Sequence, residues 1–404
     1  MMNRENIKTV VLIHPIPTPY RQDLFNEIAK ICRQNNINFI VLYEKPSEPR
    51  REHWIDVLSN LEYEYHFLDS LSINFSLIKS IAVLKPFAVK QLFSYRPQVI
   101  ICTGFSMTTI LALFHHYINK SRLMIWSGEK VLLGKLKYIR QFIRLIVLRE
   151  TEHLFVYGSR AFEFYKNKFN FPSKRMTTIL NVIPVRHNID CTELIEEKVR
   201  MLRENTIHFV YVGSIVSAKG VYYLPGMMDS LEKTLPEYFF SLIIIGKGPE
   251  RDPLHLALKK RLTRTQIDFQ GVLPNQLVLD RIAFSHFLLF PTKEEPWGHV
   301  ITEAFSVGTP VISSQCAGAA DDMMLDHKNG FIADFQKPHE IAVKLKSVVT
   351  DPEFYKEMSV FCKKYYDGLY ASLDNANRFF GVIKASIAAR EYSVHSKDGM
   401  DANL

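Results

Sequence analysis

An alternation of short apolar runs with helix-like segments along the chain is the feature that most constrains its fold. Runs such as FVYV, LIII and FLLF are almost continuously apolar, as expected of strands in a parallel sheet that helices cover on both faces. The alternation itself is typical of βαβ units. Because 404 residues exceed one ordinary core, we predict an α/β protein with two doubly wound, Rossmann-like domains.

The same patterns give the elements expected in each domain. Strands are predicted at residues 9–14, 38–43, 65–68, 99–102, 123–126 and 153–156, and then at 207–212, 240–245, 267–270, 287–290 and 311–313. The helices predicted in the first half are 21–33, 75–93, 106–118 and 135–150. The polar segment 185–205 predicts the boundary between a domain at 1–187 and one at 205–370, and residues 392–404 predict a loose tail.

Composition argues against several classes of protein. The five cysteines are scattered, with no CxxC or Cys/His ligand spacing, so we expect reduced thiols and a cytoplasmic protein, without a disulfide framework or a zinc site. The first apolar run is broken by His14 and Pro15, which makes it too short for a signal peptide. No run approaches about 18 apolar residues, so no transmembrane span is expected.

Charge is distributed unevenly between the two halves. Residues 1–190 contain 26 Lys or Arg and 15 Asp or Glu, whereas the remainder contains 24 and 27. A basic first half fits nucleic acid, anionic lipid or an anionic acceptor. Because no helix-turn-helix, zinc-finger or RNA-binding signature accompanies the charge, we expect no nucleic-acid partner.

The densest chemical signal follows the predicted strand that ends at Phe290. Glu295 lies in a polar loop, a helix is expected to start near Gly298, and Glu303 lies within that helix. Free N–H groups at a helix start favour phosphate, and carboxylates bind hydroxyls, so the segment suits a ligand with a sugar, a diphosphate and a ribose. Taken alone, either glutamate is better explained structurally, Glu295 as a first-turn acid that favours the helix dipole and Glu303 as a solvated helix residue.

Two further loops have related chemistry. One follows the strand that ends at Gly213 and delivers Lys219, a point charge suited to a diphosphate. The other, Gly246-Lys-Gly248, is not a dinucleotide-binding loop because Arg251 stands where the third glycine would be.

The segment from Glu295 to Ile312 resembles the E-P-[FW]-G-x4-E-A-x3-G-x-P-V-I signature of family 4 glycosyltransferases, retaining enzymes with two GT-B domains facing a central cleft. The resemblance implies that Glu295 contacts the donor sugar and Glu303 the ribose. It places Trp297, Gly298, His299 and Val300 by the sugar and phosphate.

The other two loops match the same family. Gly213, Ser214 and Lys219 would meet the diphosphate, although many members have Arg where this chain has Ser214. The loops with Gly246, Gly248 and Gly271 would surround the nucleobase.

The resemblance implies transfer of a sugar from a nucleoside-diphosphate sugar to a saccharide or lipid-linked saccharide acceptor. We expect no metal and no other cofactor. It also implies a C-terminal helix at about 373–391 that packs back on the first domain. Adjacent Asp321 and Asp322 are read as a solvated turn. A catalytically silent nucleotide-sugar-binding partner and a nucleotide-sugar epimerase remain alternatives.

The opening His14-Pro-Ile-Pro-Thr-Pro-Tyr20-Arg21 resembles the P-x-P-Y-R start of a branch associated with bacterial surface-polysaccharide synthesis. Tyr20 and Arg21 are therefore acceptor-side candidates, with Arg21 either facing an anionic group or serving the core. Glu129, after another predicted strand, either acts on the acceptor hydroxyl as a catalytic residue or begins a helix.

Residues 130–149 interleave six basic residues with bulky apolar ones. Such a helix can lie on an anionic inner leaflet, where each Lys or Arg contributes about 1 kcal/mol. The alternative is an ordinary domain helix with long basic side chains at its edge. We expect peripheral membrane contact here, which would suit a lipid-linked acceptor.

Overall fold

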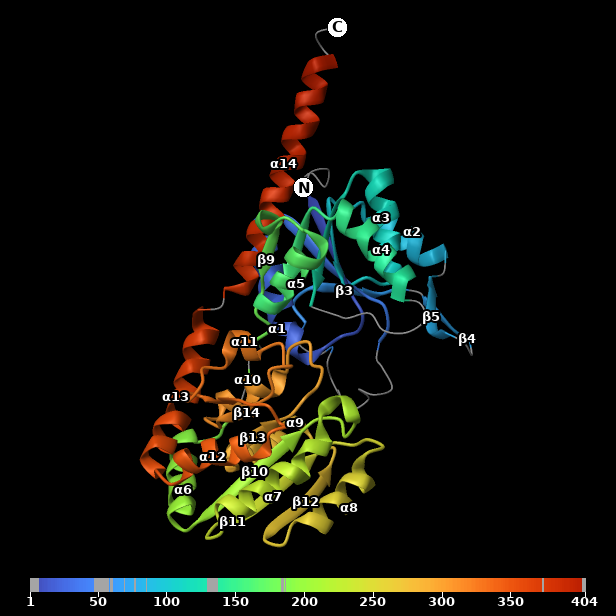
Figure 1. Ribbon diagram of the computed structural model, residues 1–404. Helices are drawn as coiled ribbons and strands as arrows, with labels where there is room; N and C mark the ends of the chain where they lie inside the picture. The colour runs from blue at the N-terminus through green and yellow to red at the C-terminus, as the bar shows by residue number, and fades with distance from the viewer. Residues whose placement is uncertain are drawn as a thin grey trace. The chain divides into compact units, whose positions relative to one another are not determined.

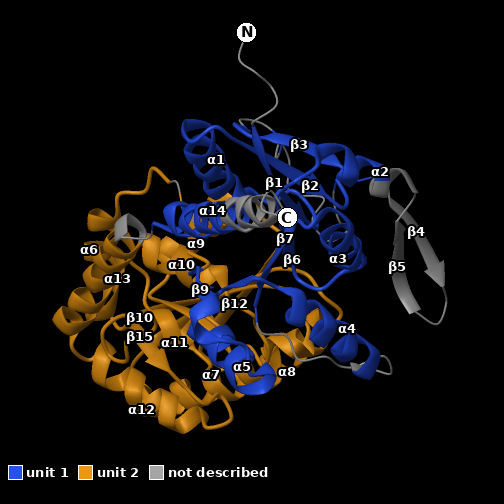
Figure 2. Cartoon of the chain, turned by 90° about the horizontal axis from the view of Figure 1, so that it is seen from above, with its two compact units in different colours: residues 1–180, 374–404 blue, residues 181–373 orange. Residues whose placement is uncertain are grey.

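The computed structural model describes residues 7–46, 58, 61–68, 70–75, 78–84, 86–128, 137–182, 185, 187–372 and 374–401. The chain forms two compact units, coloured separately in Figure 2. Unit 1 comprises Met1–Leu180 and Asp374–Leu404, and unit 2 comprises Asn181–Leu373.

Unit 1 is built on a seven-stranded sheet in the order β3-β2-β1-β6-β7-β8-β9, in which every pair of neighbours is parallel. Its strands are β1 (Lys8–His14), β2 (Ile37–Tyr43), β3 (Glu64–Phe67), β6 (Val99–Thr103), β7 (Arg122–Ser127), β8 (His153–Val156) and β9 (Met176–Thr178). Its helices include α1 (Pro19–Gln34), α3 (Met107–Asn119), α4 (Lys137–Glu150) and α5 (Ser159–Phe169) (Figure 1).

Unit 2 contains a six-stranded parallel sheet in the order β12-β11-β10-β13-β14-β15. The strands are β10 (Thr206–Val212), β11 (Phe239–Ile245), β12 (Thr265–Gly271), β13 (Phe287–Phe290), β14 (Val311–Ser313) and β15 (Gly330–Ile332). The helices are α6 (Cys191–Arg203), α7 (Leu224–Thr234), α8 (Arg251–Arg261), α9 (Asn275–Phe284), α10 (His299–Ser306), α11 (Ala320–Met323), α12 (Pro338–Val349) and α13 (Pro352–Ser372). The predicted fold class, two parallel-sheet Rossmann-like domains, is confirmed.

The boundary between the units lies earlier than the predicted segment 185–205. Within that segment, α6 is an amphipathic helix of unit 2 whose buried face includes Ile195 and Val199. Asp190 caps it by accepting hydrogen bonds from the backbone N–H groups of Thr192 and Glu193. The polar sequence that indicated a linker therefore belongs largely to the solvent side of a folded helix.

The predicted helix at 75–93 is wrong. The structure has an antiparallel hairpin of β4 (Ser70–Phe75) and β5 (Ile78–Leu84), followed by α2 (Pro86–Tyr95). Ile and Val in this stretch favour strand, and Pro86 is suited to the first position of a helix.

The chain ends in α14 (Asn375–Asp401), which belongs to unit 1 and packs against α1. Phe379, Phe380, Ile383 and Ile387 join Trp126 and Phe155 in one hydrophobic core. The predicted loose tail is wrong as far as Asp401, because the helix continues through it; adding residues to an existing helix costs far less than starting one. Within the described part of the chain, no helix has the length and apolarity needed to cross a bilayer.

Candidate functional site

The strand order of unit 2 reverses between β10 and β13, which are neighbours in the sheet although two strands separate them in sequence. From β10 the chain moves outward through β11 to β12, and then returns to the other side of β10. Open α/β sheets bind ligands beyond the carboxyl ends of strands at such a reversal. The loops that follow β10 and β13, residues 213–220 and 291–298, are therefore where a ligand is expected.

An ion pair joins these two loops. The ammonium group of Lys219, at the end of a short 3-10 turn, donates to the carboxylate of Glu295. About a quarter of the Lys219 side chain and a fifth of the Glu295 side chain are exposed. The structure thus brings together two predicted site residues that lie 76 positions apart, and leaves both accessible to a ligand.

Backbone contacts hold the two loops in register. The Lys293 N–H donates to the Ala218 carbonyl over 2.9 Å. Gly220 has φ of +67°, and a Cβ there would lie 1.9 Å from the Pro291 carbonyl oxygen. Only glycine fits this position, so the loop after β10 can press directly on the loop after β13.

The predicted nucleobase loops meet at the same edge of the sheet. The Gly213 N–H donates to the Ile245 carbonyl over 3.0 Å, and the Gly246 N–H donates to the Gly271 carbonyl over 2.6 Å. A Cβ on Gly248 would lie 2.1 Å from the Ile215 carbonyl oxygen. These glycines allow three loops to pack backbone against backbone beside Ser214, which is exposed.

Helix α10 begins at the same edge. Gly298 is its N-cap with φ of +103°, and no side chain caps the helix start, so its first N–H groups are available to an anion. Trp297 and Val300 are buried on either side of this start. Two backbone hydrogen bonds hold the loop that precedes α10. The Gly318 and Ala319 N–H groups donate to the carbonyls of residues 295 and 297 over 2.9 Å each.

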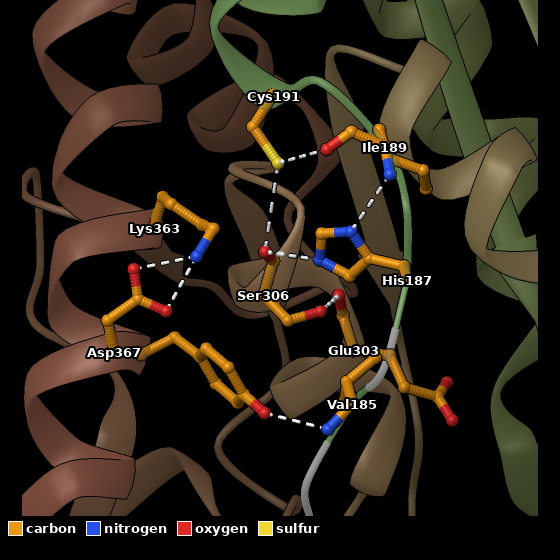
Figure 3. Close-up of polar contacts among 9 residues, drawn as sticks. Val185, His187, Ile189, Cys191, Glu303, Ser306, Lys363 and Asp367 are labelled. Carbon is orange, nitrogen blue, oxygen red and sulfur yellow. Dashed lines mark hydrogen bonds and ion pairs between the residues drawn. The ribbon is translucent and has the colours of Figure 1, made fainter.

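Glu303 lies on α10, and burial raises the pKa of its carboxyl group to about 7. Figure 3 shows its carboxylate pointing away from Ser306 and His187, while its backbone carbonyl accepts a 2.7 Å hydrogen bond from the Ser306 hydroxyl. A group with this pKa changes charge near neutral pH. It can hydrogen-bond hydroxyls as a carboxylate or as an acid.

Two contacts to α10 were missed from the sequence. His187 Nε2 lies 3.1 Å from the Ser306 carbonyl oxygen (Figure 3), and Asn181 Nδ2 lies 3.2 Å from His299 Nε2. Both residues precede α6, more than a hundred positions before their partners. No local motif signals such contacts.

The predicted acceptor-side residues of unit 1 have a different setting. Arg21 is only 5% exposed, and its guanidinium lies 4.1 Å from the ring centroid of Trp126 and 5.3 Å from that of Tyr157. Tyr20 is partly buried, with its ring centroid 5.6 Å from the same guanidinium. Of the two alternatives for Arg21, this geometry favours a role in the core.

Several other predicted residues fall outside the described ones. Glu129, Lys130 and Lys135 are among them, as is the side chain of Lys137. Arg144, expected to face lipid, is instead buried, with its guanidinium 4.9 Å from the ring centroid of Phe105. Among the described residues, no three His, Cys, Asp or Glu are grouped so as to hold a metal ion.

Comparison with known proteins agrees with this geometry. Residues 194–364 match the model of the family described as "Glycosyl transferases group 1". The 2-deoxystreptamine N-acetyl-D-glucosaminyltransferase of Niallia circulans is 24% identical over 191 residues, which cover 46% of this chain and 48% of that protein. The chain thus spans about half the length of the curated relatives it matches.

Solved structures resemble nearly the whole chain at low identity. HepE of Anabaena, crystallised with UDP and glucose, superposes with a TM-score of 0.67 at 13% identity, covering 94% of this chain and all of its own. Sucrose-phosphate synthase of Thermosynechococcus elongatus gives 0.66 at 15%, covering 95% of this chain and all of its own. At these identities the likeness establishes the fold alone.

Proposed function

We propose that this chain, which carries a group 1 glycosyltransferase domain on a GT-B fold, moves a sugar from a nucleoside-diphosphate sugar to a saccharide or lipid-linked saccharide acceptor. The observation that carries the proposal is the Lys219–Glu295 pair at the strand-order reversal, beside the uncapped start of α10. A cation, a hydroxyl-binding carboxylate and free N–H groups together match the three parts of such a donor.

Each group has a distinct task in the proposed transfer. Glu295 accepts hydrogen bonds from hydroxyls of the donor sugar, and Glu303 from those of the ribose. Lys219 and the N–H groups at the start of α10 neutralise the charge that develops on the departing diphosphate. Ser214 adds a hydroxyl donor, but no charge, where many family members have an arginine.

The stereochemistry is proposed to be retention at the anomeric carbon, from the match between Glu295–Ile312 and the signature of retaining enzymes. The transfer is also proposed to be independent of metal, because Lys219 and the helix start supply the positive charge that a metal would otherwise provide. Added chelator should therefore leave the rate unchanged.

We also propose that the protein works in the cytoplasm, at the anionic inner face of a membrane, on an acceptor for surface-polysaccharide synthesis. The described cysteines are all free thiols, which suits a reducing compartment. HepE binds UDP and UDP-glucose in its crystals, which supports a nucleotide sugar as donor for this fold. The named relatives are transferases, so neither the silent partner nor the epimerase is favoured.

The test is a thermal-shift screen with UDP-, GDP-, ADP- and dTDP-sugars, because a ligand that binds only the folded state raises the melting temperature. We expect one base to stabilise the protein and to support sugar transfer to an acceptor extract, with the product anomer assigned by NMR. Stabilisation by none of the four would overturn the proposal. Binding without turnover in any extract would favour the silent partner.

A further inference from the structure

Helix α4 of unit 1 presents an apolar face to solvent. Tyr138, Ile139, Phe142, Leu145 and Ile146 are all large and exposed, with 73% of Tyr138 and 63% of Phe142 accessible. Their spacing, i, i+1, i+4, i+7 and i+8, places them within an arc of about 120° on one side of the helix. The opposite side carries the buried Val147 and Leu148.

Helix α3 also exposes large apolar residues. It contacts α4, and the two lie side by side in Figures 1 and 2. Its residues Phe114, Tyr117 and Ile118 are each more than half exposed. We name the combined surface the α3–α4 face, made of Phe114, Tyr117, Ile118, Tyr138, Ile139, Phe142, Leu145 and Ile146.

A surface of this kind is unusual in a helix of an α/β domain, which normally turns its apolar side inward and its polar side to water. Here the inward side of α4 already packs in the domain, and even Arg144 on that side is buried against Phe105 and Phe169. Contiguous exposed apolar residues mark sites of interaction with a partner or a membrane. The α3–α4 face therefore has a function apart from holding the domain together.

The charge around the face identifies its occupant. The sequence from 70 to 150 is basic, with twelve Lys or Arg, of which Arg144 is buried, and two acidic residues, Glu129 and Glu150. Lys120, directly after α3, and Arg140 on α4 are exposed, and 87% of the Arg149 side chain is accessible. Glu150 lies within 4.0 Å of both Arg149 and His116, so bases surround the one described acid.

We infer that the α3–α4 face inserts into the surface of an anionic lipid bilayer, with its aromatic and aliphatic residues among the acyl chains and its basic rim at the headgroups. A second copy of this chain fits less well, because two such faces would bring like charges together. The inference depends on the proposed function in one respect only: membrane binding would bring the donor site to a lipid-linked acceptor. It extends the sequence expectation, in which a helix of interleaved basic and bulky apolar residues at 130–149 lay on the leaflet, by adding residues of α3 and by placing Arg144 on the buried side.

The experiment is co-sedimentation of the full chain with vesicles of phosphatidylcholine, alone and mixed with phosphatidylglycerol. We expect binding to the anionic vesicles that added salt weakens without abolishing, because insertion of apolar groups is not screened. Phe142→Glu and Ile139→Glu should each lower the partition coefficient by about tenfold or more, since each loses apolar burial and adds a repelled charge. Arg140→Gln and Arg149→Gln should each lower it by about fivefold, and on anionic vesicles only.

The matched control is Leu256→Glu, which replaces an equally exposed residue, 71% accessible, on a helix of unit 2. It should bind vesicles as the wild type does. Melting temperature and circular dichroism should be unchanged in all these variants, because the replaced side chains lie in solvent.

Three outcomes would overturn the inference. The wild type could fail to sediment with anionic vesicles, or Phe142→Glu could bind them as the wild type does. The third is a wild-type dimer that binds no vesicles and that Phe142→Glu converts to monomers. Donor binding, measured by thermal shift in the same variants, should be unaffected because the donor-site residues lie in unit 2. Vesicle binding without any donor binding would leave docking intact and refute the proposed function instead.

Discussion

Arg21 in unit 1 and Lys219 in unit 2 occupy corresponding places in two sheets of the same kind. Arg21 follows β1, next to β6, and Lys219 follows β10, next to β13; in both sheets the strand order reverses at that point. Lys219 pairs with a carboxylate from the neighbouring loop and stays accessible. Arg21 stacks on Trp126 and Tyr157 and is buried.

The difference shows that topology provides the place for a ligand, while local partners decide whether a charge is available to it. A lysine that pairs with a carboxylate and stays a quarter exposed can still be reached by a ligand phosphate. An arginine between aromatic rings loses packing if it moves. Lys219 is therefore available to a ligand, whereas Arg21 is held in the core of its unit.

The largest effect expected from this comparison is on catalysis. Lys219→Ala should lower the transfer rate by about a hundredfold to a thousandfold, as loss of one group that stabilises transition-state charge does elsewhere. Glu295→Gln should also lower the rate, because a carboxamide oxygen accepts weaker hydrogen bonds from the sugar hydroxyls than a carboxylate does. The measurement is the initial rate with the donor identified by thermal shift. Glu294→Gln, the exposed neighbour in the same loop, should be close to wild type, and full activity of Lys219→Ala would refute its role.

For the free energy of unfolding we expect the opposite order, with a larger effect at Arg21 than at Lys219. Arg21→Ala should lower the free energy of unfolding by about 2–4 kcal/mol, because it empties a buried site lined by aromatic rings. Lys219→Ala should lower it by about 1 kcal/mol, because Glu295 then loses its counter-charge, and Arg33→Ala, an exposed arginine on the same helix as Arg21, should change it by about 0.5 kcal/mol or less. Denaturant unfolding measures all three.

If Arg21→Ala is as stable as wild type but inactive, then Arg21 serves the acceptor and the contrast between the units fails. Arg21→Lys refines the test. It keeps the charge but loses the planar stacking surface, so it should be destabilised nearly as much as Arg21→Ala.

The sequence predicted unit 2 better than unit 1 for a physical reason. The strand, glycine, lysine and glutamate positions of unit 2 are tied together by backbone contacts that only glycine permits, as at Gly220 and Gly246. Such positions can be recognised as a motif in the sequence. The Lys219–Glu295 contact follows once both loops are placed at one edge of the sheet.

In unit 1 the deciding contacts are made by side chains whose type does not reveal their direction. The sequence indicated an available cation at Arg144 and left Arg21 open between an available cation and a core residue, and both are buried beside aromatic residues. The apolar face of α4 is equally ambiguous, because the periodicity of a helix does not say which side meets water. The hairpin at β4 and β5 was missed because short apolar runs fit strand and helix alike.

A third prediction concerns the stability that unit 2 loses when the buried carboxyl group of Glu303 becomes charged. Burial raises the pKa of Glu303 from an ordinary 4.5 to about 7, so the folded protein holds a proton that the unfolded chain releases at lower pH. Stability from this group is complete below pH 4.5 and is lost as pH rises through 7, by at most about 3 kcal/mol.

Glu303→Gln should remove this dependence, so that the variant gains stability relative to wild type between pH 5 and 8. Melting temperature against pH, without donor, measures the difference. If the two curves run parallel, the group is solvated and the prediction is wrong. Donor affinity should rise with pH over the same range if the carboxylate is the form that holds the ribose.

The smallest effect compares two glycines that share a left-handed backbone and differ in the space around them. Gly104, after β6 in unit 1, has φ of +82° and open space for 4 Å around the point where a Cβ would lie, whereas a Cβ on Gly220 in unit 2 would meet the Pro291 carbonyl at 1.9 Å. Gly104→Ala should cost about 1 kcal/mol of backbone strain. Gly220→Ala should cost about 1–2 kcal/mol more, because the loop that carries Lys219 has to move, and only Gly220→Ala should also slow transfer. Equal stability losses and equal rates in the two variants would mean that contact between the loops after β10 and β13 is not what places Lys219 beside Glu295.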